Sequence, residues 1–189
     1  MLYKRRGKRA LDVTMAVAGL LVSSPVLALT AAAVWLEDGK PVLFSQTRAG
    51  SSGSTFTIRK FRSMPVHTAD IPSADACQLR VTRIGERLRR TGLDELPQLW
   101  NVLRGEMSLV GPRPALPSQV DLLSFRHQNL ADDLRPGVTG LAQVRAYDGM
   151  PEKEKAAHDV EYAAEITLLK DLRILVRTVH YLRKPPPTY

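Results

Sequence analysis

A long apolar segment near the start of the chain dominates its hydrophobic pattern. Residues 13–36 include no charged side chain, and more than about 18 consecutive apolar residues are typical of a membrane helix. Three arrangements fit this pattern. They are a cleaved signal peptide, one straight spanning helix, and a re-entrant helix that enters and leaves the bilayer by the same face.

Pro25 and the basic flanks favour the re-entrant arrangement. Pro25 lacks the N–H that a continuous helix would use, so it should kink the helix, and Ser24 can hydrogen bond to a carbonyl that the proline leaves free. Basic flanks prefer the cytoplasm, and a straight helix would place one of them outside. A half-segment of about 12 residues rises roughly 18 Å, which reaches only mid-bilayer. A spanning helix kinked at Pro25 is the alternative.

After residue 36 the pattern changes to short elements separated by glycine and proline. Two β-prone stretches, 42–46 and 55–59, predict a hairpin. The other expected elements are a polar loop or lid at 64–78, helices at 83–91 and 96–103, helical spacing at 118–134, a mostly helical segment at 152–182 that ends at the prolines 185–187, and rigid turns at 111–114 and 135–140. The predicted fold class is α/β, mainly helical with a small β-hairpin and no large nucleotide-binding sheet.

The last predicted helix is amphipathic and basic. Its apolar face would comprise Ile166, Leu169, Leu172, Leu175, Val176 and Val179, with lysine and arginine beside it. Such a helix can lie on an anionic membrane as an interfacial helix, or it can pack on a core with a solvated basic edge. The sequence leaves both interpretations open.

The net charge of the chain narrows the classes of molecule that it could bind. The 189 residues carry a net charge of +8, which suits nucleic acid, anionic lipid or phosphorylated substrates. Zinc spacing and a recognition-helix signature are both missing from the sequence, so nucleic acid is disfavoured. The four histidines are scattered and are interpreted as surface or packing residues. The single Cys77 gives no internal disulfide, which favours a reduced, cytosolic setting.

The chemistry concentrates at Asp94 and Glu95. These carboxylates follow a cluster of arginines and open a predicted helix. A helix N-terminus and nearby guanidinium groups favour ionised carboxylates and also bind phosphate. A carboxylate beside phosphate can coordinate Mg²⁺ or attack phosphorus. A capping role beside a salt bridge is the alternative.

The motif around this pair resembles the bacterial sugar transferase family, the monotopic phosphoglycosyl transferases. The matching residues in this chain are Leu93-Asp94-Glu95-Leu96-Pro97-Gln98-Leu99, Asn101-Val102-Leu103, Met107-Ser108 and Gly111-Pro112-Arg113-Pro114. Further matches are Lys8-Arg9 with Asp12, Ser24-Pro25, Gln46, Arg48, Gly50, Phe56, Lys60-Phe61-Arg62-Ser63-Met64, Pro136-Gly137-Val138-Thr139-Gly140 and Ala142-Gln143-Val144.

The resemblance implies a mechanism and a location. Asp94 would attack the β-phosphorus of a UDP-sugar and bind Mg²⁺, UMP would leave, and undecaprenyl phosphate would take the phosphosugar. Glu95 would assist through the metal or a proton. Residues 1–36 would form the re-entrant membrane helix with its break at Ser24-Pro25. Residues 37–189 would form a catalytic domain on anionic lipid at the cytoplasmic face of the bacterial inner membrane, with a homodimer as a possible assembly.

Several polar side chains are candidates for substrate binding. Lys60, Arg62, Arg89 and Arg113 would bind phosphate, and Gln143 and Arg145 would contact the nucleotide or sugar. For each cation the alternative is a solvated charge or a structural salt bridge. A non-catalytic basic membrane scaffold and a secreted binding protein are the rival functions.

The chain also departs from the common family pattern. Leu141 stands where many members have tryptophan, Glu106 replaces a usual aspartate, and residues 145–151 differ from the frequent Asn-Gly-Arg. Tyr147-Asp148-Gly149-Met150-Pro151 resembles the branch that handles N-acetylated deoxyamino sugars. These differences concern sugar specificity and leave the carboxylate pair intact.

Overall fold

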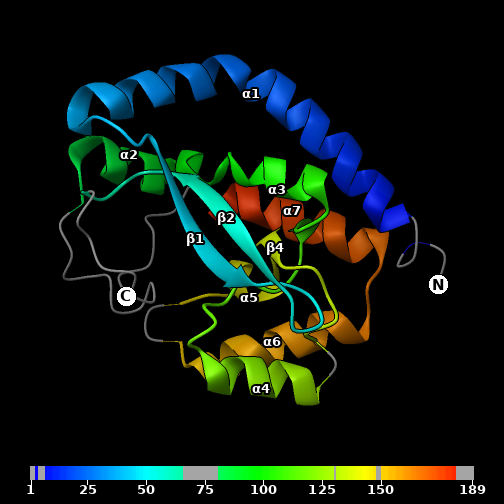
Figure 1. The fold of residues 1–189 in the computed structure, drawn as a ribbon. Helices are drawn as coiled ribbons and strands as arrows, with labels where there is room; N and C mark the ends of the chain where they lie inside the picture. Colours follow the sequence, from blue (N-terminus) through cyan, green and yellow to red (C-terminus); the bar gives the residue numbers. More distant parts are fainter. Residues whose placement is uncertain (1–2, 4–6, 66–80, 130, 148–149, 182–189) are drawn as a thin grey trace.

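The computed structural model describes residue 3 and residues 7–65, 81–129, 131–147 and 150–181. The predicted loop or lid at 64–78 lies outside the described residues from residue 66 onward, as do the prolines at 185–187. The fold is mostly helical with two small sheets, which confirms the predicted mainly helical fold and its hairpin (Figure 1).

The elements follow one another along the chain as short pieces after one long helix. In order they are α1 (Lys8–Asp38), β1 (Leu43–Ala49), β2 (Thr55–Phe61), α2 (Arg83–Thr91), the 3₁₀ turn η3 (Leu93–Glu95), α3 (Gln98–Arg104), β3 (Ser108–Val110), α4 (Val120–Gln128), β4 (Gly137–Thr139), α5 (Leu141–Val144), α6 (Glu152–Ala164) and α7 (Leu168–Tyr181). Helix α1 arches over one side of the molecule, and α4 and α6 lie on the opposite side (Figure 1).

The hairpin turns a row of side chains toward the interior. Strands β1 and β2 pair antiparallel, with Leu43 opposite Phe61 and Ala49 opposite Thr55. Phe56 and Ile58 of β2 are buried in the main core. Because side chains alternate along a strand, Lys60 lies on this same inward face.

A second sheet pairs a segment just before one predicted rigid turn, 111–114, with a segment inside the other, 135–140. Strands β3 and β4 pair parallel, and Gly137 of β4 lies opposite Ser108. Gly111 N–H donates to Thr139 O at 2.9 Å, and a Cβ on Gly111 would lie 2.4 Å from Arg135 O. This close backbone approach requires glycine. Strands of three residues are too short to show alternation in the sequence, so the predicted turn at 135–140 is wrong in part.

The helix predictions differ in accuracy. The 83–91 prediction coincides with α2, which Thr82 caps by accepting from Gly85 N–H at 2.9 Å. The predicted helix at 96–103 begins later, at Gln98, because η3 precedes it. Among the described residues of 118–134, the helix that forms is α4. The 152–182 segment divides into α6 and α7, because Thr167 starts a new helix by accepting from Lys170 N–H at 3.2 Å.

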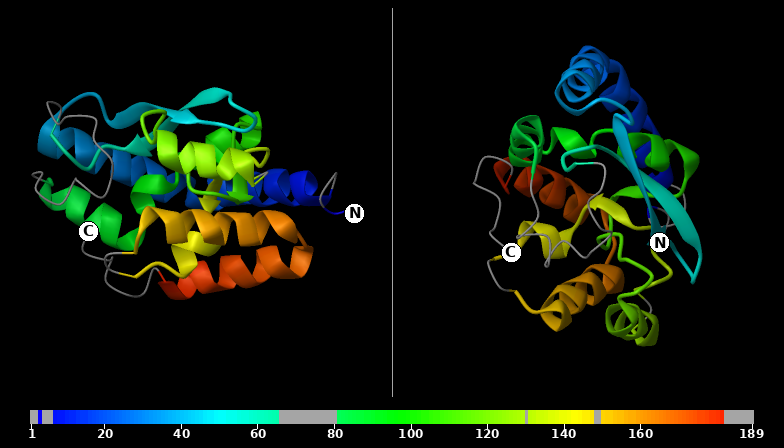
Figure 2. Two further views of the ribbon diagram at one scale, coloured as in Figure 1. Left: turned by 90° about the horizontal axis from the view of Figure 1, so that it is seen from below. Right: turned by 60° about the vertical axis from the view of Figure 1, so that its left-hand side comes forward.

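Helix α7 exposes most of its predicted apolar face. Leu169, Val176 and Val179 are 57%, 71% and 58% exposed, respectively. The side chains of α7 that are buried are Ile174 and Asp171. Short helix α5 contacts both α6 and α7 and lies between them (Figure 2). Of the predicted row, Ile166 and Leu175 pack against the main core, whereas Leu169, Leu172, Val176 and Val179 are exposed.

Helix α1 continues through Pro25, where a side-chain hydrogen bond replaces the backbone hydrogen bond that proline cannot make. Ser24 Oγ donates to Leu21 O at 2.8 Å. Leu21 O is the carbonyl that the missing N–H of Pro25 would bind in a regular helix. The predicted compensation by Ser24 is thus present, and Figure 1 shows α1 bending along its length.

The first turns of α1 are fastened to the rest of the fold. Lys8 Nζ lies 2.7 Å from Asp171 Oδ2, and Arg9 donates to Val102 O at 2.6 Å at the end of α3. Buried Asp12 accepts from Leu109 N–H at 2.9 Å and from Ser108 Oγ at 3.1 Å. These residues therefore anchor α1 to α3, β3 and α7.

The last turn of α1 is fastened to the same body. Glu37 accepts from the backbone N–H groups of Arg83 and Ile84, both at 3.0 Å, at the start of α2. Val34 is buried in a cluster with Phe61 and Leu88. Between its two anchored ends α1 exposes large apolar side chains, with Leu21 at 71%, Val22 at 82% and Leu29 at 72%. Among the described residues α1 is the one helix long and apolar enough to cross a membrane.

Candidate functional site

Asp94 and Glu95 lie at a sharp change of direction between two helices. Helix α2 ends at Gly92, whose φ of 68° is in the left-handed region that glycine adopts readily. The 3₁₀ turn η3 follows and carries both carboxylates, and Pro97 precedes α3. Asp94 is 8% exposed. The local sequence therefore places a buried Asp94 and a partly buried Glu95 in the turn between the basic helix α2 and α3.

Glu95 is held by two cations. Lys60 Nζ lies 2.6 Å from Glu95 Oε1, and an Arg113 Nη lies 3.9 Å from the same oxygen. Burial raises the pKa of Glu95, but the charges of Lys60 and Arg113, with hydrogen bonds from Lys60 and Gln98, outweigh it and lower the pKa to about 2. Glu95 is therefore a fixed anion at neutral pH, as the sequence led us to expect.

Asp94 has a different electrostatic setting. Burial, followed by the charge of Glu95, raises the pKa of Asp94, and the charges of Lys60 and Arg89 oppose this rise. In the described part of the chain, no lysine or arginine nitrogen lies within 4.0 Å of the Asp94 carboxylate. At Asp94 the cations that favour the anion are therefore outweighed by desolvation, which raises the pKa.

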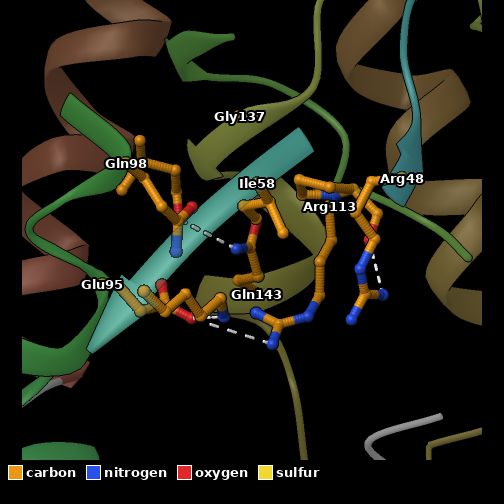
Figure 3. Close-up of a pocket in the computed structure, with 10 residues that line it drawn as sticks. Arg48, Ile58, Glu95, Gln98, Arg113, Gly137 and Gln143 are labelled. Atoms are coloured by element: carbon orange, nitrogen blue, oxygen red, sulfur yellow. Dashed lines mark hydrogen bonds and ion pairs between the residues drawn. The ribbon is translucent and has the colours of Figure 1, made fainter. Parts of the chain in front are cut away.

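A small, open pocket lies beside Glu95 (Figure 3). Its lining residues are Arg48, Ile58, Lys60, Glu95, Gln98, Arg113, Pro114, Gly137, Val138 and Gln143. Lys60 comes from the hairpin, Arg113 from the turn after β3, and Gln143 from α5. Arg113 points toward Glu95 in the close-up. The fold therefore brings together four of the predicted site residues from distant parts of the chain.

Gln143 reaches the pocket from α5. Gln143 Nε2 donates to Val138 O at 3.1 Å, while its Oε1 atom is buried without a hydrogen-bond partner in the described structure. An acceptor left in this state is available to a ligand donor. Its position agrees with a substrate-contacting role.

Arg62 and Arg89 make structural contacts and are not among the residues that line this pocket. Arg62 is 6% exposed, and an Nη atom lies 3.0 Å from Asp38 Oδ2 at the end of α1. Arg89 Nε donates to Ser63 Oγ at 2.9 Å. Arg89 acts electrostatically on Asp94, whereas Arg62 holds the C-terminal end of α1. Neither side chain lines the described pocket.

Arg145 and the Ser24-Pro25 pair lie apart from the pocket lining. Arg145 forms an ion pair with Glu161 of α6 and contacts His158. Ser24 and Pro25 lie within α1. These positions bring neither the arginine nor the helix break next to Glu95 in this conformation.

Sequence reasoning assigned no site role to Arg48 or Gln98, which also line the pocket. Arg48 donates to Pro114 O at 3.3 Å and to the side chain of Gln46. Gln46 and Arg48 are two residues apart, so they lie on one face of β1. That spacing, and the place of Arg48 among the family matches, was the available signal. Gln98 is 2% exposed at the start of α3, and its signal was its place in the family motif at 93–99.

Comparison with known proteins identifies the family. A family profile described as bacterial sugar transferase matches residues 3–184. The UDP-glucose:undecaprenyl-phosphate glucose-1-phosphate transferase of Caulobacter vibrioides is 44% identical over 181 residues, covering 91% of this chain and 68% of that protein. Exopolysaccharide production protein PSS of Rhizobium leguminosarum bv. phaseoli is 41% identical over 187 residues, covering 91% of this chain and 92% of that protein.

A relative with another named sugar matches almost as well. The UDP-N-acetylgalactosamine-undecaprenyl-phosphate N-acetylgalactosaminephosphotransferase of Aeromonas hydrophila is 37% identical over 185 residues, covering 91% of this chain but 42% of that protein. The profile match extends over nearly the whole chain and includes the residues that line the pocket and both carboxylates of η3. The chain is therefore a transferase that belongs to the bacterial sugar transferase family.

Proposed function

We propose that the protein transfers a sugar-1-phosphate from a UDP-sugar to undecaprenyl phosphate. The names of the relatives support this donor and acceptor. The observation that carries the proposal is the acidic pair in η3, in which Glu95 is ion-paired to Lys60 and Asp94 is not ion-paired within the described structure. This asymmetry suits two carboxylates with different tasks.

The reaction proceeds by two displacements at one phosphorus. An Asp94 carboxylate oxygen attacks the β-phosphorus of the donor, the bond from that phosphorus to the bridging oxygen breaks, and UMP leaves with the bonding electrons. A phosphate oxygen of undecaprenyl phosphate then attacks the same phosphorus, and the bond to Asp94 breaks. The products are UMP, a diphosphate-linked lipid sugar and regenerated Asp94. Because the phosphosugar is held covalently on Asp94 between the two steps, the two anionic substrates bind the site one after the other.

Lys60, Arg113 and Arg89 neutralise the charge that develops on the phosphoryl oxygens. Lys60 and Arg113 already converge on Glu95, so Glu95 holds two cations in place when no diphosphate is bound. Preorganised charge of this kind costs little rearrangement during the reaction. The charge of Arg89 lowers the pKa of Asp94 and so opposes the effect of burial on the nucleophile.

Mg²⁺ fits this chemistry as an ion bound by protein and substrate phosphate together. No group of three or more metal-binding side chains occurs in the portion of the chain that the structure describes. Mg²⁺ commonly uses one or two carboxylates with substrate phosphate and water, and the acidic Asp94 without a close cation meets that need. Asp94 would hold the ion, which would supply charge neutralisation at the diphosphate.

Helix α1 acts as a re-entrant membrane helix on the cytoplasmic face of the bacterial inner membrane. Both its ends contact the same domain, through Asp12 at the start and Glu37 at the finish, which supports entry and exit on one side. Its exposed apolar middle would lie in lipid. The exposed row of α7 and half-exposed Trp100 of α3 would rest at the interface.

The donor sugar is proposed to be an N-acetylated deoxyamino sugar, on the resemblance of Tyr147-Asp148-Gly149-Met150-Pro151. UDP-glucose is the competing donor, because the relative at 44% identity is named for glucose. Asp148 and Gly149 lie outside the described residues, so the distinction depends on turnover.

The test is a panel of UDP-sugars incubated with the membrane-reconstituted protein, undecaprenyl phosphate and Mg²⁺. We expect UMP release with the cognate donor and a lipid-linked product that carries one sugar. Release of UDP would instead indicate ordinary glycosyl transfer and would contradict the proposal. Absence of both nucleotides across glucose, N-acetylhexosamine and deoxyamino donors would favour the basic scaffold.

A further inference from the structure

The turn that carries Arg113 is fixed to its surroundings at every residue. Four of the hydrogen bonds that hold the turn involve neighbouring backbone segments and Arg48. They are Gly111 N–H to Thr139 O at 2.9 Å, Gly137 N–H to Pro112 O at 2.8 Å, an Arg48 Nη to Pro114 O at 3.3 Å, and Ala49 N–H to Ala115 O at 2.9 Å. The prolines on either side restrict the backbone further. Of the residues 111–116, only Arg113 is exposed.

The fifth hydrogen bond comes from a buried side chain on the opposite side of the molecule from α1. Arg126 of α4 donates from Nη1 to Arg113 O at 3.1 Å. Its Nε and Nη2 atoms donate to Asp159 Oδ2 of α6 at 3.0 and 2.6 Å. The side chains of Arg126 and Asp159 are 7% and 3% exposed. The planar guanidinium thus divides its donors between one carboxylate and one carbonyl.

We propose that Arg126, oriented by Asp159, is a positioning residue that sets where the Arg113 side chain stands over Glu95. The kinetic part of this inference rests on the proposed function. The carbonyl and the side chain of Arg113 share one Cα, so fixing the carbonyl restricts the direction in which the guanidinium leaves the turn. A misplacement of about 1 Å can lower an enzyme rate by about 100-fold. Helices α4 and α6 would thereby contribute to phosphate binding without touching substrate.

An ion pair that only stabilises the fold would give the same contacts, so the test must separate the two roles. Removing one partner of a buried pair leaves an uncompensated charge, and the variant could unfold. Replacing both partners by apolar residues avoids this cost. The variant Arg126→Met with Asp159→Leu therefore removes the tie to Arg113 O and keeps the packing. Arg126→Lys keeps the charge but loses the planar fork.

The experiment measures kcat/KM for the donor in full-length protein in lipid nanodiscs, with thermal unfolding recorded for each variant. We expect the double replacement and Arg126→Lys to lower kcat/KM by about 10- to 100-fold. In an Arg113→Ala background the double replacement should change kcat/KM by less than about 2-fold, because Arg126 acts through Arg113. His127→Ala, which removes an exposed side chain on the same helix, should leave kcat/KM unchanged.

Hydrogen exchange provides a readout that does not depend on turnover. The amides of Gly111 and Gly137, which donate hydrogen bonds from and to this turn, should exchange at least about 10-fold faster in the double replacement, with α2 and the hairpin unaffected. If the wild type turns over no donor, the proposed function fails while this local acceleration still supports the positioning role. Unchanged exchange in the turn overturns the inference. So does an activity loss that is equally large in the Arg113→Ala background.

Discussion

Lys60 Nζ lies 2.6 Å from Glu95 Oε1, across the contact between the hairpin and the turn that carries the acidic pair. The two residues are 35 positions apart in the chain. Their ion pair fixes the one carboxylate of the dyad whose pKa falls to about 2. The pKa of Asp94, the residue just before Glu95, shifts in the opposite direction, because burial outweighs the charge of Lys60 there.

Replacing Lys60 by Met should raise the pKa of Glu95 from about 2 toward its ordinary value of 4.5. A depressed carboxylate pKa stabilises the fold above the unfolded pKa, and this stabilisation is lost as pH falls from about 4.5 to about 2. The unfolding temperature of wild type should therefore fall more steeply over this window than that of Lys60→Met. If the unfolding temperatures of wild type and Lys60→Met fall in parallel as pH is lowered, the ion pair adds no pH-dependent stability.

The acid limb of activity should report Asp94, because its pKa is raised whereas that of Glu95 is lowered. Protonation of the nucleophile stops attack, so the rate should fall as pH drops through the pKa of Asp94. Arg89 lowers this pKa by its charge. Arg89→Gln should therefore move the acid limb to higher pH. A pH–rate profile of kcat/KM measures the shift, and movement to lower pH would contradict this electrostatic assignment.

Asp12 should be important for stability rather than for chemistry. It is 2% exposed and accepts hydrogen bonds from Leu109 N–H and Ser108 Oγ. Asp12→Ala would leave buried donors unpaired and should lower the free energy of unfolding by about 3 kcal/mol. Urea unfolding in detergent micelles measures this change. As a matched control, Glu86→Ala on an exposed part of α2 should cost less than about 0.5 kcal/mol.

Membrane topology can be tested with cysteines at the two ends of α1. In a Cys77→Ser background, one cysteine is added ahead of Met1 and, separately, Lys40 is replaced by Cys. Because both ends of α1 contact one domain, a membrane-impermeant maleimide should label neither in intact spheroplasts and both after permeabilisation. Labelling of one position alone in intact spheroplasts would indicate a spanning helix and refute the re-entrant arrangement.

The sequence predicted those elements whose ends carry chemical signals. Thr82 and Gly92 bound α2, and its predicted limits coincide with the observed ones. Ser24 next to Pro25 predicted the substitute hydrogen bond to a free carbonyl, which the structure contains. Capping residues and proline act over a few positions, so a single sequence is sufficient to recognise them.

The features that the sequence missed depend on partners far along the chain. Strand β3 has three residues and is defined by pairing with β4, and no alternation is readable over that length. The contact of Arg126 with Arg113 O depends on how α4 packs. Arg62 was predicted to bind phosphate, yet its charge pairs with Asp38. Basic residue type alone does not separate a structural ion pair from a substrate contact.

Intact-mass spectrometry of the protein after incubation with the cognate UDP-sugar and Mg²⁺, without lipid acceptor, tests the covalent role of Asp94 most directly. We predict a mass increase equal to one phosphosugar, located on Asp94 by peptide mapping and removed when undecaprenyl phosphate is added. Asp94→Asn, which preserves the size of the side chain, should show no adduct. Turnover by the wild type without an adduct, or an undiminished rate in Asp94→Asn, would contradict the proposed relay.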